Sequence, residues 1–288
     1  MSYKEFAKKI KEVFINFLIK IKIYFSYFKM KFLNEIQYKI AALAGIATQF
    51  AWGGMYIMLY TTFLANGSSS DYTVSQMSTF LWLQQALLML FNLWTIDKNI
   101  FEECESGQIS MELIRPINLY SIWHARTLGR KLAATFLRAF PIFIICSLPF
   151  LGEYRLAPPV DMGAFILFII TLILSALILM ACIMIMYIVV MKNVSSKGIR
   201  SIFRIVIEFL SGAAIPIAFM PDFFVNILKC TPFYYMQNVP FNIYIGYISS
   251  PEEIAKIILM QLIWLVALTA VGKKIMNKQL KKVVVQGG

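Results

Sequence analysis

Charged residues are scarce in this sequence. They make up 15% of its 288 residues, while 59% are hydrophobic; an ordinary soluble domain has about 25% charged residues. A soluble domain this apolar would lack the charged surface that it needs, which argues against a water-soluble enzyme. The acidic residues are the scarcer kind, because 15 Asp and Glu stand against 27 Lys and Arg and give a net charge of +12. A membrane protein accommodates both facts, since lipid solvates the apolar residues and the charges collect in loops.

Residues typical of catalytic and metal sites are also scarce. His124 is the single histidine, which excludes a His-based zinc site and a Ser-His or Cys-His catalytic group. The four cysteines form no C-x-x-C, and no G-x-x-x-x-G-K-[ST] loop for ATP occurs. We therefore expect no catalytic residue, no metal and no cofactor bound by this chain.

Six long apolar runs predict an all-α polytopic membrane protein. A membrane-spanning helix needs about 20 apolar residues. The runs cover Ile40–Leu64, Ser75–Ile96, about Leu132–Leu151, Met162–Met191, about Ile199–Met220 and about Ile254–Gly272. They are continuously apolar rather than alternating, which favours six transmembrane helices within residues 40–272 over a barrel.

The basic residues gather on one side of these predicted spans. On that side lie 24 of the 27, in residues 1–39, in the inner loop 97–131, in the next inner loop, in the span ends beside these two loops, and in the tail 273–288. The other side keeps only Arg155, Lys229 and Lys256. Because cytoplasmic loops carry the excess of Lys and Arg, both termini are predicted to be cytoplasmic. The net charge then reports orientation, and we expect no nucleic-acid partner.

Residues 1–39 predict an amphipathic helix, or two. Bulky apolar residues recur every three or four positions from Phe6 to Phe32, and lysines fill much of the other face. The lysines continue to residue 39 without a short apolar core and cleavage site, so a signal peptide is not expected. The pattern favours a helix on the cytoplasmic leaflet in contact with membrane lipids. A soluble helix bound to a partner is the alternative.

The inner loop 97–131 stands out because acidic residues gather in it, namely Asp97, Glu102, Glu103, Glu105 and Glu112. A short helix is predicted over Asn99–Glu105, ended by Gly107. A second short segment would be capped by Ser110 and ended by Pro116, and a helix would resume near Leu119. Two interpretations stay open: a docking element for a cytoplasmic partner, or a solvated loop whose acids balance nearby lysines.

The outer segment 221–251 is too apolar for a free loop and too rich in proline for a span. Short re-entrant or interfacial helices between spans five and six fit both properties. The segment is interpreted either as an outer gate or as an aromatic belt that only anchors the protein. Candidate gate residues are Pro216, Phe219, Pro221, Phe233 and Tyr235.

Five polar side chains fall within or beside the predicted spans: Gln84, Gln85, Arg138, Arg204 and Glu208. Such residues line a pathway or pair with one another, since lipid does not solvate them. Arg204 and Glu208 are four residues apart and can pair on one helix face. The two glutamines need partners in a bundle or a wet cavity. Both the pathway and the structural interpretation stay open.

Several motifs resemble those of type-2 ABC exporter permeases. Gly107, Ile109, Leu113, Ile114 and Pro116 match a "G-x-[LI]-x-x-L-L-x-x-P-[IV]" loop. Residues 211–222 resemble an "SG-x-x-x-P-[LI]-x-x-[FL]-P" segment, and residues 232–235 a "P-F-x-Y" element. "ELIRPIN" at Glu112–Asn118 and "W-x-x-R-x-L-G-R" at Trp123–Arg130 resemble a bacterial six-span branch. The resemblance covers about residues 24–275.

This resemblance implies a permease subunit in the bacterial cytoplasmic membrane that is not itself an enzyme. It would pair with a second permease chain, identical or different, and bind two ABC ATPase subunits that hold ATP and Mg. Such permeases export drugs, antimicrobial peptides, lipids or other amphipathic substrates. The alternatives are a self-sufficient secondary transporter, although the sequence shows no clear inverted repeat, and a non-catalytic scaffold subunit.

The resemblance also assigns parts. The helix near Tyr24–Lys39 would be the elbow helix, and the loop near Asn99–Ser110 the coupling helix seated in the ATPase. The implied ATPase-coupling residues are Glu102, Glu103, Gly107, Ile109, Leu113, Arg115 and Pro116.

Overall fold

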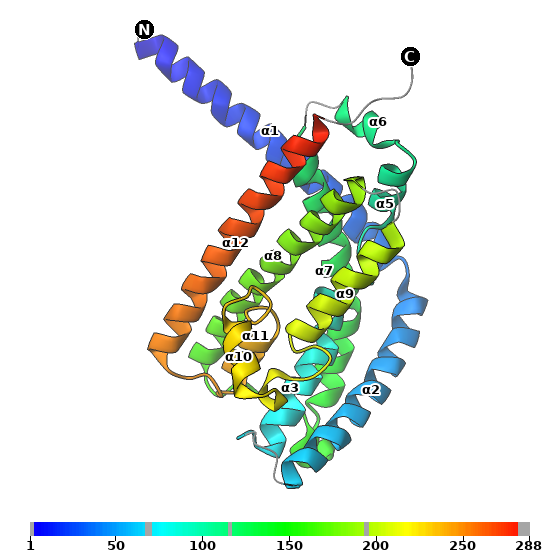
Figure 1. The fold of residues 1–288 in the computed structure, drawn as a ribbon, viewed down its shortest axis with the longest axis vertical. Coiled ribbons are helices and arrows are strands. Elements are labelled where there is room, and N and C mark those ends of the chain that lie inside the picture. The colour runs from blue at the N-terminus through cyan, green and yellow to red at the C-terminus, as the bar shows by residue number, and fades with distance from the viewer. Residues whose placement is uncertain (1–2, 67–70, 115–116, 193–195, 282–288) are drawn as a thin grey trace.

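The computed structural model describes residues 3–66, 71–114, 117–192 and 196–281, and these residues are helical with no strands (Figure 1). The helices are α1 Tyr3–Ile36, α2 Lys39–Ala65, α3 Val74–Ala86, α4 Leu88–Phe91, α5 Lys98–Glu105, α6 Ile109–Leu113, α7 Leu119–Cys146, η1 Pro149–Tyr154, α8 Met162–Lys192, α9 Ser196–Leu210, η2 Ile217–Phe219, α10 Asp222–Lys229, α11 Asn238–Tyr244 and α12 Pro251–Leu280. The predicted all-α fold class is confirmed.

Three of the described helices are long and apolar enough to cross a membrane: Ala42–Ala65 of α2, Met162–Lys192 and Pro251–Leu280. They coincide with the first, fourth and sixth predicted spans. The fifth run forms only the 15-residue α9. At 1.5 Å per residue this helix covers about 22 Å, short of the roughly 30 Å hydrocarbon core. Six spans therefore stay a prediction.

The second predicted span is interrupted. It divides into the 13-residue α3 and the short α4, and the backbone turns extended at Asn92. The ammonium of Lys131 on α7 donates to the carbonyls of Leu90 and Asn92, which the break leaves without helical partners. The run Ser75–Ile96 is thus uncharged throughout but not one helix, because a buried lysine on another helix satisfies the freed carbonyls.

Helix α7 replaces the third predicted span and begins at Leu119, near where the helix was expected to resume. It lies inside the bundle and packs against α1, α2, α3, α4 and α8. Four cationic side chains project from it, which keeps it outside the set of strongly apolar helices: Arg126, Arg130, Lys131 and Arg138.

Residues 3–36 form one continuous helix, as the amphipathic pattern predicts. Figure 1 shows the N-terminal half of α1 extending beyond the bundle, while its C-terminal half crosses the end where α5, α6 and the last turns of α12 lie. Gly129 of α7 permits this crossing, because a Cβ there would lie 2.4 Å from the carbonyl oxygen of Phe28. The rings of Phe28 and Phe32 stack at 5.7 Å beside the crossing.

The outer segment folds into the short helices α10 and α11, as its prolines and aromatics predict. Every residue of α11 is buried, and this helix packs against α8 and α3. The backbone just before it is fixed by two other helices. Ser175 of α8 donates to the carbonyl of Tyr235 at 2.8 Å, and Gln261 of α12 donates to the same oxygen at 3.0 Å.

Candidate functional site

The inner loop folds as its local sequence predicts, with one difference. Helix α5 starts after Asp97, whose carboxylate accepts a hydrogen bond from the N–H of Asn99. It ends at Gly107, which has φ +76°, a conformation that favours glycine. Helix α6, however, begins at Ile109 without a side-chain cap. The expectation that Ser110 caps it is wrong, because Ser110 lies inside its first turn and bonds the carbonyl of Gly107 instead.

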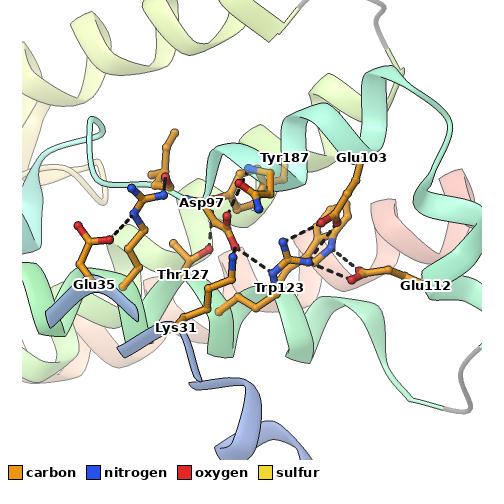
Figure 2. Close-up of polar contacts among 12 residues, drawn as sticks. Lys31, Glu35, Asp97, Glu103, Glu112, Trp123, Thr127 and Tyr187 are labelled. Carbon is orange, nitrogen blue, oxygen red and sulfur yellow. Dashed lines mark hydrogen bonds and ion pairs between the residues drawn. The ribbon is translucent and has the colours of Figure 1, made fainter. Parts of the chain in front are cut away.

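A single guanidinium fixes this loop to α7. Arg126 donates to Asp97 Oδ2 at 2.9 Å, to both oxygens of Glu103 at 2.8 and 3.1 Å, and to Glu112 Oε1 at 3.0 Å. Lys31 of α1 forms a second ion pair with Asp97 at 3.0 Å. Figure 2 shows the carboxylates of Asp97, Glu103 and Glu112 converging on one point. We call these five residues the Arg126 cluster.

Aromatic and hydroxyl groups complete the polar contacts around the cluster (Figure 2). The indole N–H of Trp123 donates to Glu112 at 3.2 Å. The hydroxyl of Tyr187 on α8 accepts from the backbone N–H of Asp97 at 3.1 Å and lies 3.1 Å from the hydroxyl of Thr127. The start of the loop is therefore tied to α1, α7 and α8 at once.

A separate ion pair, between α7 and α1, lies one turn further along α7. Arg130 binds Glu35 of α1 at 3.1 Å and donates to the carbonyl of Ile96 at 3.2 Å. With Arg126 in the cluster, Trp123 bonded to its Glu112, and Gly129 at the α1 crossing, the "W-x-x-R-x-L-G-R" motif has a structural meaning. It joins the inner loop, α1 and α7 into one unit.

Electrostatics keep the cluster charged. Burial alone would raise the pKa of the Asp97 carboxyl, but the adjacent Arg126 and Lys31 outweigh it and lower that pKa. Burial alone would lower the pKa of Arg126, and its hydrogen bonds to Glu103 with the three carboxylate charges raise it instead. Asp97, Glu103 and Glu112 therefore pair with one guanidinium, which the solvated-loop interpretation does not predict, whereas Glu102 and Glu105 are exposed.

The predicted ATPase-coupling residues differ in their exposure to solvent. Glu102 and Gly107 are exposed, while Ile109 is buried and Leu113 packs against the core. Glu103 is engaged with Arg126. Arg115 and Pro116 lie outside the described residues.

Sequence reasoning missed two apolar side chains that the loop leaves uncovered. Met111 is 70% exposed and Ile114 is 80% exposed, although three carboxylates of the same loop turn inward to Arg126. The sequence could have indicated them, because apolar residues in a short polar loop are not part of a membrane span. An apolar tip on a rigid loop is suited to docking on a protein.

The loop also reaches α9. Glu105 Oε1 accepts a hydrogen bond from the backbone N–H of Ser196, the first residue of α9, at 2.7 Å. The guanidinium of Arg200 lies 4.9 Å from the ring centre of Phe101. Helix α5 therefore contacts the helix that carries Glu208.

Four of the five predicted intramembrane polar residues, Gln84, Gln85, Arg138 and Glu208, line one cavity of about 360 Å³ between α2, α3, α4, α7 and α9. Gln84 donates to the carbonyl of Ala213 at 2.8 Å. The carbonyl of Gln85 accepts from Gln49 at 2.9 Å. Arg204 does not line the cavity, and within the described part of the chain no ion pair joins it to Glu208.

The predicted gate residues take up different positions. Phe219 packs on α2, its ring centre 4.9 Å from that of Tyr60. Pro221 borders an outer cavity of about 740 Å³. Tyr235 is buried and donates to the carbonyl of Lys229 at 2.9 Å, while Pro216 is buried and Phe233 is half-buried. These five residues therefore do not meet at one point.

A family model described as "ABC-2 family transporter protein" matches residues 50–287. The chain belongs to the ABC-2 transporter family. The match includes the inner loop, the outer segment and the cavity residues other than Thr48 and Gln49. It supports a permease subunit of an ABC transporter, embedded in a membrane and without an ATPase domain of its own. No curated protein matches this ABC-2 family member.

Proposed function

We propose that this ABC-2 protein is the membrane-spanning subunit of an ABC exporter in the bacterial cytoplasmic membrane. It forms half of a dimeric pathway with a second permease chain, and two separate ATPase subunits that hold ATP and Mg drive it. The exposed tip of the inner loop docks on an ATPase. The substrate is a drug, an antimicrobial peptide, a lipid or another amphipathic molecule.

The observation that carries this proposal is the apolar tip on a rigid loop. If the loop were flexible, it would bend when the partner moves, and the motion would not reach the helices. Here Arg126 joins the loop start, α5 and α6 to α7 through buried and partly buried hydrogen bonds. Met111 and Ile114 stand out from that rigid body. A partner that holds the tip therefore moves α5, α6 and α7 together.

Contacts between α5 and α9 connect the loop to the cavity. Glu105 and Phe101 contact the first turns of α9, and Glu208 near the other end of α9 lines the cavity. The nucleotide-bound and nucleotide-free ATPase bind the two conformations of the permease with different affinity. Nucleotide binding therefore shifts the population of these two conformations. In this proposal α9 carries that shift to the cavity.

The proposal is tested by replacing the apolar tip. Ile114→Asp in the full chain should abolish co-purification of the ATPase subunits and their stimulation, while the melting temperature of the permease stays the same. Met162→Asp is the matched control, because Met162 is 72% exposed at the opposite end of the bundle. Retained ATPase binding in Ile114→Asp would refute docking by the tip. Transport by the purified chain alone in liposomes would refute the ABC mechanism and favour a secondary transporter.

Glu103→Lys is a poor test of docking, although Glu103 is among the predicted coupling residues. Its carboxylate binds Arg126, so a lysine there would disrupt the Arg126 cluster as well as the loop surface. Gly107→Trp is cleaner, because none of the described residues lies within 4 Å of a Cβ at Gly107. The φ of +76° still strains any other residue there, so its effect on stability is measured alongside.

A further inference from the structure

The cavity between α2, α3, α4, α7 and α9 holds two buried oxygen atoms that accept no hydrogen bond in the described part of the chain. They are Oε1 of Gln49 and Oε1 of Glu208. Gln49 is 3% exposed and its amide nitrogen is already used by the carbonyl of Gln85. A buried acceptor without a donor costs free energy. Both atoms can only be satisfied by a group that donates.

The charges around the cavity also favour a ligand that donates hydrogen bonds. Glu208 has no ion-pair partner within the described residues, although Arg204 attracts it from the same helix at longer range. Arg138 also borders the cavity, but its guanidinium lies against Gly45 of α2 and interacts electrostatically with Glu35. Each of these two charges therefore has one opposite charge at longer range, and of the two side chains Glu208 is the one with a buried atom that lacks a hydrogen-bond partner in the described part of the chain.

The remaining wall is aromatic. Trp52 and Tyr56 of α2 line it, with ring centres 5.7 Å apart, and Trp94 lines it from the segment after α4. Trp52 and Trp94 are each about half exposed, at 52% and 53%. Faces of Trp and Tyr attract organic cations, and more strongly where water is excluded.

We infer that this cavity is a binding site for an amphipathic organic cation that carries N–H donors. The cationic group lies between the carboxylate of Glu208 and the side-chain amide oxygen (Oε1) of Gln49. The apolar body lies against Trp52, Tyr56 and Trp94. This inference rests on the proposed function, since it names the class of substrate that the exporter takes into its membrane cavity.

The experiment compares two probes on the full chain in nanodiscs of uncharged lipid, with empty nanodiscs as the blank. The first probe is 9-aminoacridine, an aromatic cation with N–H donors at neutral pH. The second is acridine, which has the same ring system but is neutral and lacks those donors. The wild type should bind 9-aminoacridine at least about tenfold more tightly than acridine. Glu208→Gln should remove that preference, and Glu252→Gln, at the exposed start of α12, should keep it.

The outcomes separate clearly. Equal binding of the two probes by the wild type, or an undiminished preference in Glu208→Gln, would overturn the inference. The wild-type comparison decides even if Glu208→Gln fails to fold, and Trp52→Leu provides a second variant that should weaken 9-aminoacridine binding. ATPase association is scored on the same preparations. Intact association without cation preference removes only the substrate class, whereas cation preference without any ATPase association removes the exporter function.

Discussion

Glu105 and Ser196 connect the inner loop to α9, since the Glu105 carboxylate accepts the first backbone N–H of that helix at 2.7 Å. Hydrogen bonds from Ser196, the stronger effect coming from its side chain and the next from this backbone N–H, lower the pKa of the Glu105 carboxyl. The N-terminal N–H groups of a helix have no partner within the helix, and they favour a negative charge. The pair therefore caps α9 from another element of the chain.

Removing this contact should uncouple α9 from the loop. We expect Glu105→Ala to keep the ATPase bound but to lower transport per ATP hydrolysed, because the docking tip is intact and the cap is lost. Glu105→Gln keeps an acceptor oxygen and should restore part of the coupling. The measurement is substrate transport and ATP hydrolysis by the same proteoliposomes. An unchanged ratio in Glu105→Ala would contradict the role of the cap.

Arg126 should be the most sensitive single position in the inner loop. Arg126→Met leaves the carboxylates of Asp97, Glu103 and Glu112 without their main cation. Breaking a buried ion pair by removing one partner costs about 3–5 kcal/mol. We expect a lower melting temperature and loss of ATPase stimulation. Arg155→Met, at an exposed position in the described structure, should change stability by no more than about 0.5 kcal/mol.

Gly129→Ala tests the crossing of α1 and α7. The added Cβ would lie 2.4 Å from the backbone oxygen of Phe28, so α1 must move. Overpacking of this kind costs about 1–3 kcal/mol. Gly54→Ala in α2 is the control, because no atom of the structurally described segments lies within 4 Å of a Cβ there and alanine favours a helix. Thermal unfolding of both variants should show a loss for Gly129→Ala only.

The cluster also predicts a dependence on acid. The pKa of Asp97 is lowered on folding, so its contribution to stability is complete above the unfolded value of about 3.9 and is lost as pH falls through the lower folded value. Melting temperatures of the wild type should therefore drop more steeply below about pH 4 than those of Asp97→Asn. Parallel curves for the two proteins would show that Asp97 is not held by Arg126 and Lys31.

Cysteine labelling tests the predicted orientation. Cys230 is exposed in the outer segment, while Cys146 and Cys182 are buried. Burial and the adjacent Glu103 and Glu112 raise the pKa of Cys104 to about 12, which leaves little reactive thiolate. A membrane-impermeant maleimide added to intact cells should label the wild type and not Cys230→Ser. Labelling only after the cells are opened would place this segment on the cytoplasmic side and reverse the predicted topology.

The sequence by itself determined the class of protein and the local structure of its loops. Three of the six apolar runs form long apolar helices, so α2, α8 and α12 were predictable from length and composition. Helix α5 and its end at Gly107 were predictable because capping depends on neighbouring residues and on one φ angle. The family resemblance rested on the same local motifs, and the family match confirms it.

Only the tertiary structure decided which of these residues face one another. Asp97 and Arg126 are 29 positions apart, and Lys31 reaches the same carboxylate from α1. The break after α4 depends on Lys131 of a different helix, and the cavity gathers residues from α2, α3, α4, α7 and α9. Charge and hydropathy patterns give the identity and spacing of side chains along one element. Packing between distant elements decides whether an acid meets solvent, a lysine or a buried guanidinium.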